Sequence, residues 1–140
     1  MLLNISYNDP KQKKRIDEAV GKTFSLKERW RLSGIGSEKL IITSSSIDIH
    51  NLLMLDKNIN TCNVELRPKG IIVRFRSLLE TYGLIIPYFK LKLYKGKSHE
   101  YSIYLDKYFV KVLANSNGVH KFFRKINDQK VLNIPPNLGD

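Results

Sequence analysis

Residues 115–127, with the sequence NSNGVHKFFRKIN, decide the fold of this chain of 140 residues. The apolar side chains of this stretch recur at positions i, i+3, i+4 and i+7, a spacing that places them on one face of a helix. They are Val119, Phe122, Phe123 and Ile126. Each phenylalanine contributes about 2–3 kcal/mol when fully buried, so this face needs an apolar partner. We predict a helix over residues 115–130 that packs on a sheet.

Short strands precede this helix. Apolar and polar residues alternate in several segments that are separated by turn residues, namely 64–67, 71–76, 90–95, 101–105 and 108–113. In the second segment, Arg74 and Arg76 are expected on the face opposite Val73. Turns such as 68–70 and 96–98 are too short for the crossovers that parallel neighbours need. The sequence therefore predicts an antiparallel sheet, with an edge or bend at Pro87.

The first third of the chain has a different pattern. Residues 9–21 predict a helix that begins at Asp9-Pro10 and ends at Gly21. A strand is expected from Lys39. Two other segments, 24–32 and 45–57, fit either a helix or a strand, and both interpretations remain open.

The length favours a single domain. Its expected parts are a helical extension packed on the sheet (1–38), antiparallel strands (39–114), the closing helix (115–130) and a tail (131–140). The predicted fold class is α+β, with a strongly bent antiparallel sheet or partly open barrel. A C-terminal amphipathic helix closes it, and an N-terminal helix is added.

Positive charge is the clearest feature of the composition. The chain has 24 Lys and Arg against 13 Asp and Glu, which gives a net charge of +11. Such an excess attracts phosphates, anionic lipid heads and acidic proteins, although lysines also serve simply to keep a surface soluble. The cations are spread over residues 11–31 and 65–100, so they do not form one basic tail.

No catalytic pattern is visible. The three histidines, His50, His99 and His120, are far apart and lack metal-binding spacing. Cys62 is the single cysteine, so it excludes a disulfide framework, and we expect it to be a core residue. The pair Gly34 and Gly36 lacks the third glycine of a dinucleotide-binding loop. We predict that the protein is not an enzyme, with no catalytic residue, metal or cofactor.

One segment carries a family resemblance. YGLIIPYFKL, residues 82–91, is similar to the I-P-Y-x-x-I segment of bacterial pleckstrin-homology-type domains, in which short strands and a closing helix follow. The likeness covers residues 63–130, about half of the chain. It implies a pleckstrin-homology-like fold and a binding or scaffolding module rather than a particular chemistry.

Five basic residues are candidates for binding an anion. Lys69, Arg74 and Arg76 are similar to the K-xn-R-x-R pattern with which eukaryotic pleckstrin-homology domains read phosphoinositides. Arg74 and Arg76 should lie about 7 Å apart on one strand face, close enough to share a phosphate-bearing head group. Lys90 and Lys92 are further candidates. The alternative is that Arg74 and Arg76 are simply solvated residues on the outer face of an antiparallel sheet. Only Gly70 to Val73 separates Lys69 from Arg74, which departs from the long loop of the family pattern.

The aromatic residues favour a second hypothesis about function. Tyr94 and Tyr104, with Lys92 nearby, are candidates for stacking single-stranded nucleic acid. Tyrosine is also an ordinary strand residue whose hydroxyl stays in water. This function is the alternative to the binding of an anionic membrane face, lipid head group or acidic protein partner.

Targeting signals are absent from the pattern of the chain. Residues 1–9 lack the basic start and long apolar run of a signal peptide, and the longest apolar stretch is Leu52–Leu55. We expect a cytoplasmic protein without a transmembrane segment, or one that is peripheral to the inner face of the membrane.

Overall fold

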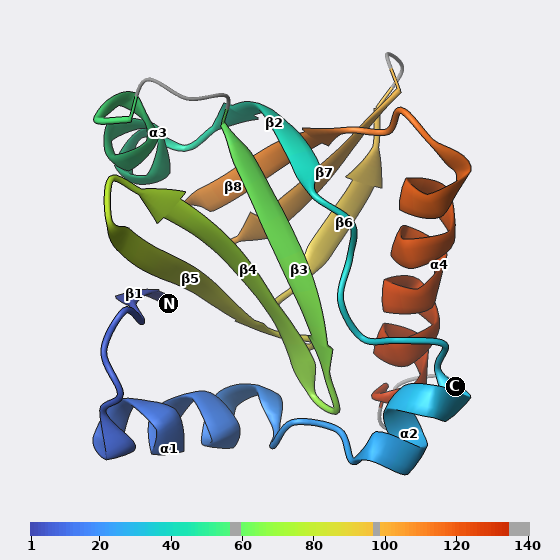
Figure 1. The fold of residues 1–140 in the computed structure, drawn as a ribbon. Coiled ribbons are helices and arrows are strands. Elements are labelled where there is room, and N and C mark those ends of the chain that lie inside the picture. The colour runs from blue at the N-terminus through green and yellow to red at the C-terminus, as the bar shows by residue number, and fades with distance from the viewer. Residues whose placement is uncertain (57–59, 97–98, 135–140) are drawn as a thin grey trace.

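The fold is α+β (Figure 1) in a computed structural model that describes residues 1–56, 60–96 and 99–134. In chain order the elements are β1 (Leu2–Asn4), α1 (Pro10–Val20), α2 (Leu26–Arg31), β2 (Leu40–Ser45), α3 (Ile47–Met54), β3 (Thr61–Arg67), β4 (Gly70–Ser77), β5 (Glu80–Pro87), β6 (Lys92–Lys95), β7 (Glu100–Leu105), β8 (Tyr108–Leu113) and α4 (Asn117–Leu132). The predicted turn at 96–98 and the predicted tail at 131–140 fall partly outside the described residues.

The described strands form one antiparallel sheet in the order β1-β5-β4-β3-β2-β8-β7-β6. The predicted antiparallel arrangement is confirmed. β2 joins the two halves, because Leu40 and Ile41 pair with β3 whereas Ile42 to Ser45 pair with β8. The register shifts between Ile42 and Ser44, and an irregularity of this kind lets a strand bend from one partner to another.

The predicted closing helix is confirmed as α4. Ser116 is its N-cap, and the Ser116 hydroxyl accepts the backbone N–H of Val119 at 3.3 Å. The helix continues to Leu132, two residues beyond the predicted end and into the segment expected to be a tail. Its four apolar residues at helical spacing, Val119, Phe122, Phe123 and Ile126, are all buried in the main core.

One ring contact fixes this helix on the sheet. Phe123 stacks on Tyr101 of β7, with ring centroids 4.2 Å apart and an interplanar angle of 6°. The main core also contains the inward residues of β4, which are Ile71, Val73 and Phe75, so the alternation expected for this strand is confirmed. The interior of the curved sheet and the apolar face of α4 therefore form one core.

A second apolar cluster lies on the outer face of the sheet. Val20 of α1 packs there with Ile72 of β4 and Ile85 of β5, and all three are fully buried. The predicted helix at 9–21 is confirmed, with the Asp9 side chain accepting the N–H of Lys11 at its start. α1 thus covers part of the outer face of β4 and β5.

Three further elements complete the chain. The two segments whose structure was left open contain the helices α2 and α3; Ser25 and Glu28 form a capping box at the start of α2. β1 was not expected from the sequence, since three residues carry no pattern. β1 pairs with Tyr82 to Leu84 of β5 and forms one edge of the sheet.

We predict that Phe123→Ala lowers the free energy of unfolding by about 3–5 kcal/mol, because it removes a fully buried ring and its stacking partner. Denaturant unfolding measures this change. Arg124→Ala is the control, because Arg124 is exposed on the same helix and its replacement should change stability by less than about 0.5 kcal/mol. Equal effects of the two variants would contradict the packing of α4.

Candidate functional site

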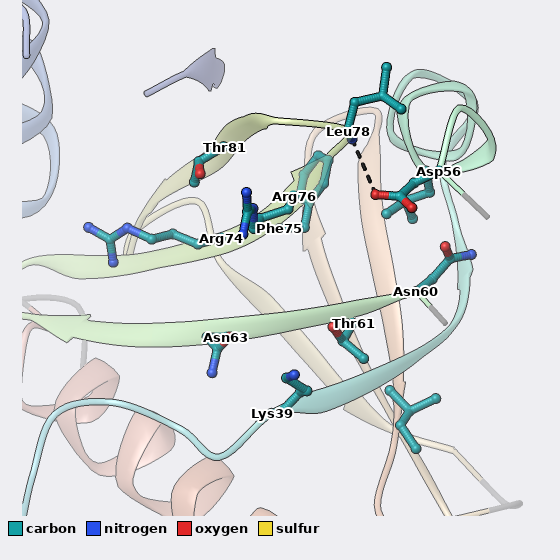
Figure 2. Close-up of a pocket in the computed structure, with 12 residues that line it drawn as sticks. Lys39, Asp56, Asn60, Thr61, Asn63, Arg74, Phe75, Arg76, Leu78 and Thr81 are labelled. Atoms are coloured by element: carbon teal, nitrogen blue, oxygen red, sulfur yellow. Dashed lines mark hydrogen bonds between the residues drawn. The ribbon is translucent and has the colours of Figure 1, made fainter. Parts of the chain in front are cut away.

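A groove of about 1050 Å³ lies on the outer face of the sheet (Figure 2). Its walls come from β2, β3 and β4, and its end is formed by Asp56, which follows α3, and by Leu78 in the turn between β4 and β5. Neutral polar side chains line its floor: Asn60, Thr61 and Asn63. Among the described residues, the cations of the lining are Lys39, Arg74 and Arg76. We call this feature the groove.

The structure brings together two of the predicted anion-binding residues in this groove. Arg74 and Arg76 alternate with the buried residues Val73 and Phe75, so the pleat of β4 places both guanidinium groups on the outer face. Arg74 is partly exposed and donates from Nη1 to Oε1 of Glu65 at 3.1 Å. Arg76 is exposed and, within the described residues, forms no ion pair. The guanidinium of Arg76 is therefore available to a ligand.

Lys39 is a site residue that sequence reasoning missed. It immediately precedes β2, on the far wall of the groove from β4, and its side chain is exposed. β2 pairs with β3, which in turn pairs with β4, and these long-range pairings bring Lys39 toward the arginines. Only its outward position, opposite to that of Leu40, was available as a sequence signal.

Two carboxylates limit the positive charge here. Glu65 accepts from Arg74 and also from Arg67, a buried residue that pairs with Asp17 at 3.2 Å. Asp56 lines the groove, and its Oδ2 accepts the backbone N–H of Leu78 at 3.2 Å (Figure 2). Glu65 is thus paired with two arginines. The groove keeps a net positive charge, because the negative charge of Asp56 does not balance its cations.

The other three predicted cations lie elsewhere. Lys69 is in the turn before β4, and Lys90 follows β5, where it faces Asp106 at 3.9 Å. Lys92 begins β6. Lys69 is separated from Arg76 by most of the length of β4, because a strand extends about 3.3 Å per residue. The binding of anions by these three lysines stays a prediction.

The predicted stacking residues do meet. Tyr94 and Tyr104 are in edge contact, with ring centroids 5.5 Å apart, and Tyr104 lies 5.7 Å from Phe109. Lys92 is opposite Tyr104 in the strand pairing, and Nζ of Lys111 is 5.8 Å from the Phe109 ring centroid. We call Tyr94, Tyr104 and Phe109 the aromatic row. Sequence reasoning missed Phe109, because its partner in β7 was not known.

The histidines and Cys62 are part of neither the groove nor the aromatic row. Among the described residues, no group of three His, Cys, Asp or Glu side chains is placed to hold a metal ion. His120 shares a hydrogen bond of 2.8 Å between its Nδ1 and the hydroxyl of Tyr101. Burial raises the pKa of the Cys62 thiol to about 12, so this thiol stays protonated at neutral pH.

Comparison with protein-family models, curated proteins and solved structures finds no match for this chain. In the described part of the chain, no helix is long and apolar enough to cross a membrane. The groove and the aromatic row are the two features that bring predicted site residues together.

We predict that Cys62 reacts with a water-soluble disulfide reagent far more slowly in the native protein than in denaturant. The raised pKa leaves little thiolate at about pH 8, and burial also blocks access. The same protein unfolded in guanidinium serves as the control. Rapid modification of the native chain would show that the thiol is not held in the core.

Proposed function

We propose that this chain is a non-enzymatic binding module of the pleckstrin-homology-like type, whose groove binds a phosphate-bearing anion. The observation that carries the proposal is the placement of Arg74 and Arg76 on one face of β4, with Lys39 on the opposite wall of the same groove. Guanidinium groups bind phosphate oxygens through paired, charge-assisted hydrogen bonds. The lining amides and hydroxyl add neutral donors around these charges.

The topology supports the pleckstrin-homology-like assignment. β2 to β5 form one antiparallel meander and β6 to β8 form a second, and β8 returns to pair with β2. α4 then packs against the interior, as the resemblance of residues 63–130 implies. This architecture is suited to presenting surface residues on a rigid sheet, and the function depends on which residues these are.

The lining of the groove favours binding over catalysis. Its described charged residues are three cations and Asp56, whose Oδ2 holds the backbone of Leu78. Neither the histidines nor Cys62 belong to this lining. The groove thus provides charge pairing and hydrogen bonds, as a phosphate on a lipid head group or on a soluble ester requires.

We predict that Arg74→Ala combined with Arg76→Ala weakens the binding of a soluble inositol polyphosphate by about tenfold or more, measured by calorimetry. The matched control is Lys13→Ala with Lys14→Ala, which removes the same charge from exposed positions of α1. The control should bind like the native chain. Equal losses in both variants would indicate a diffuse charge effect, and absence of native binding would overturn the proposal.

The aromatic row favours a second candidate function, the binding of single-stranded nucleic acid. Two tyrosines and a phenylalanine in mutual contact, with Lys92 and Lys111 beside them, offer ring surfaces for bases and charges for phosphates.

For this second function we predict that Tyr94→Ala weakens oligonucleotide binding by about 1–3 kcal/mol, the typical contribution of one stacked base. Fluorescence anisotropy with a labelled oligonucleotide measures the affinity, which should fall steeply with salt. Tyr7→Ala is the control, because Tyr7 is also exposed but lies outside the row. Native protein that fails to bind the oligonucleotide would exclude this function.

A further inference from the structure

At one end of the molecule, the segments that follow α1, β5 and α4 are all hydrogen-bonded to a single turn. The turn is Pro68–Lys69, between β3 and β4. The N–H of Lys69 donates to the carbonyl of Val20 at the end of α1, at 2.8 Å, and the N–H of Tyr88 donates to the carbonyl of Lys69 at 2.9 Å. Nδ2 of Asn133, just after α4, donates to the carbonyl of Pro68 at 3.0 Å. We call this the basal end; in Figure 1 it lies at the bottom, opposite α3.

α2 is fixed at this end by its neighbours but leaves its own apolar side chains uncovered. Phe24, just before α2, is buried in the main core. On the other side of α2, the carbonyl of Gly34 accepts a hydrogen bond from Nζ of Lys125 at 3.2 Å. α2 itself buries none of its residues. Leu26 is 82% exposed and Trp30 is 71% exposed, and their spacing of four residues places both on the same helix face.

Two other elements add apolar side chains to the basal end. Phe89, in the turn after β5, is 84% exposed, and Leu132, in the last turn of α4, is 75% exposed. The segment after β5, which contains Phe89, is close to α4, because Nζ of Lys130 donates to the carbonyl of Leu91. A single exposed apolar residue is ordinary, but large ones gathered from separate elements indicate an interaction surface.

Exposed cations lie on the same segments as these apolar side chains. The exposed ones on or near α2 and in the two turns are Lys22, Lys27, Arg31, Lys69 and Lys90. Several carboxylates of this end already have partners: Asp17 pairs with Arg67, Glu28 caps α2 and Asp106 faces Lys90. Asp128 and Glu18 are the exposed acids of the adjoining helices. With the pairs Lys90–Asp106 and Arg67–Asp17 set aside, the remaining cations of this end still outnumber its remaining acids. The cations are Lys22, Lys27, Arg29, Arg31 and Lys69, and the acids are Glu18, Glu28 and Asp128.

We propose that the basal end docks on an anionic lipid bilayer, with Leu26, Trp30 and Phe89 entering the interfacial layer and the surrounding lysines and Arg31 near the lipid phosphates. A tryptophan and other large apolar residues ringed by Lys and Arg are typical of surfaces that lie in the membrane interface. These side chains are largely exposed and none of them lines the groove, so they are suited to entering a soft phase. A folded protein partner would instead have to supply matching pockets.

This surface is separate from the groove. Lys69 precedes β4, whereas Arg76 is near the far end of that strand, so a chain docked through its basal end leaves the groove open to water. The groove would then take a soluble phosphate ester, while the membrane is bound elsewhere. Membrane docking and the proposed function of the groove can therefore fail independently.

Trp30 is the single tryptophan of the chain, so its fluorescence reports directly on the proposed contact. Vesicles of phosphatidylcholine containing phosphatidylserine should shift its emission to the blue and protect it from an aqueous quencher. Vesicles of phosphatidylcholine alone should have a much smaller effect, and added salt should weaken binding. Absence of a shift that depends on phosphatidylserine would overturn the proposal.

Paired variants locate the contact. Leu26→Glu with Phe89→Glu should reduce vesicle partition at least about tenfold while leaving Trp30 in place as the reporter. Ile47→Glu with Leu79→Glu is the matched control, because both residues are exposed and belong to α3 and the β4–β5 turn, away from the basal end. The control should partition like the native chain. Equal losses in the two pairs, or a larger loss in the control, would contradict docking through the basal end.

The groove variant separates the two proposals. Arg74→Ala with Arg76→Ala should leave vesicle partition and the Trp30 shift unchanged, even though it weakens inositol polyphosphate binding. Loss of partition in this variant would assign the membrane contact to the groove and overturn docking through the basal end. A Trp30 shift of the same size with a single-stranded oligonucleotide in place of vesicles would also overturn it.

Discussion

The burial of one face of α4 inside the curved sheet is the interaction on which the rest of the structure depends. Phe123 stacks on Tyr101, and the same core contains the inward side chains of β4. Because side chains of a strand alternate between its two faces, fixing Val73 inward also fixes Arg74 and Arg76 outward. The direction of the candidate anion-binding residues is thus set by the packing of a helix on the opposite side of the sheet.

The outer face of β4 and its neighbouring strands is divided between α1 and the groove. Val20 of α1 packs on Ile72 and Ile85, and a side chain at Gly70 would meet the carbonyl of Ile86 at 2.3 Å and Val20 at 2.6 Å. Glycine at this position therefore allows the helix to approach the start of β4 closely. Farther along β4 the face is uncovered, and this is where Arg76 lies. α1 covers one part of the face and leaves the other as the groove.

Local periodicity explains what could be predicted from the sequence. The buried face of α4 and the outward position of Arg74 and Arg76 both follow from spacing within one element. Lys39 could not be assigned to the groove, because its place depends on the pairing of β2 with β3. Lys69 was grouped with the arginines through the K-xn-R-x-R pattern, whereas it lies in the turn before β4 and the arginines lie along the strand. The exposed face of α2 was missed because Leu26 and Trp30 also fit alternation.

Native-state hydrogen exchange tests most directly whether the helix and the sheet form one core. If they do, the amides of Phe123 and Ile126 in α4 should exchange only by the same global opening that exposes Val73 in β4 and Ile103 in β7. Their free energies of exchange would then agree with each other and with the global free energy of unfolding. Exchange of the α4 amides at a much lower free energy, while the strand amides stay protected, would show that the helix detaches from an independently stable sheet and would contradict this account.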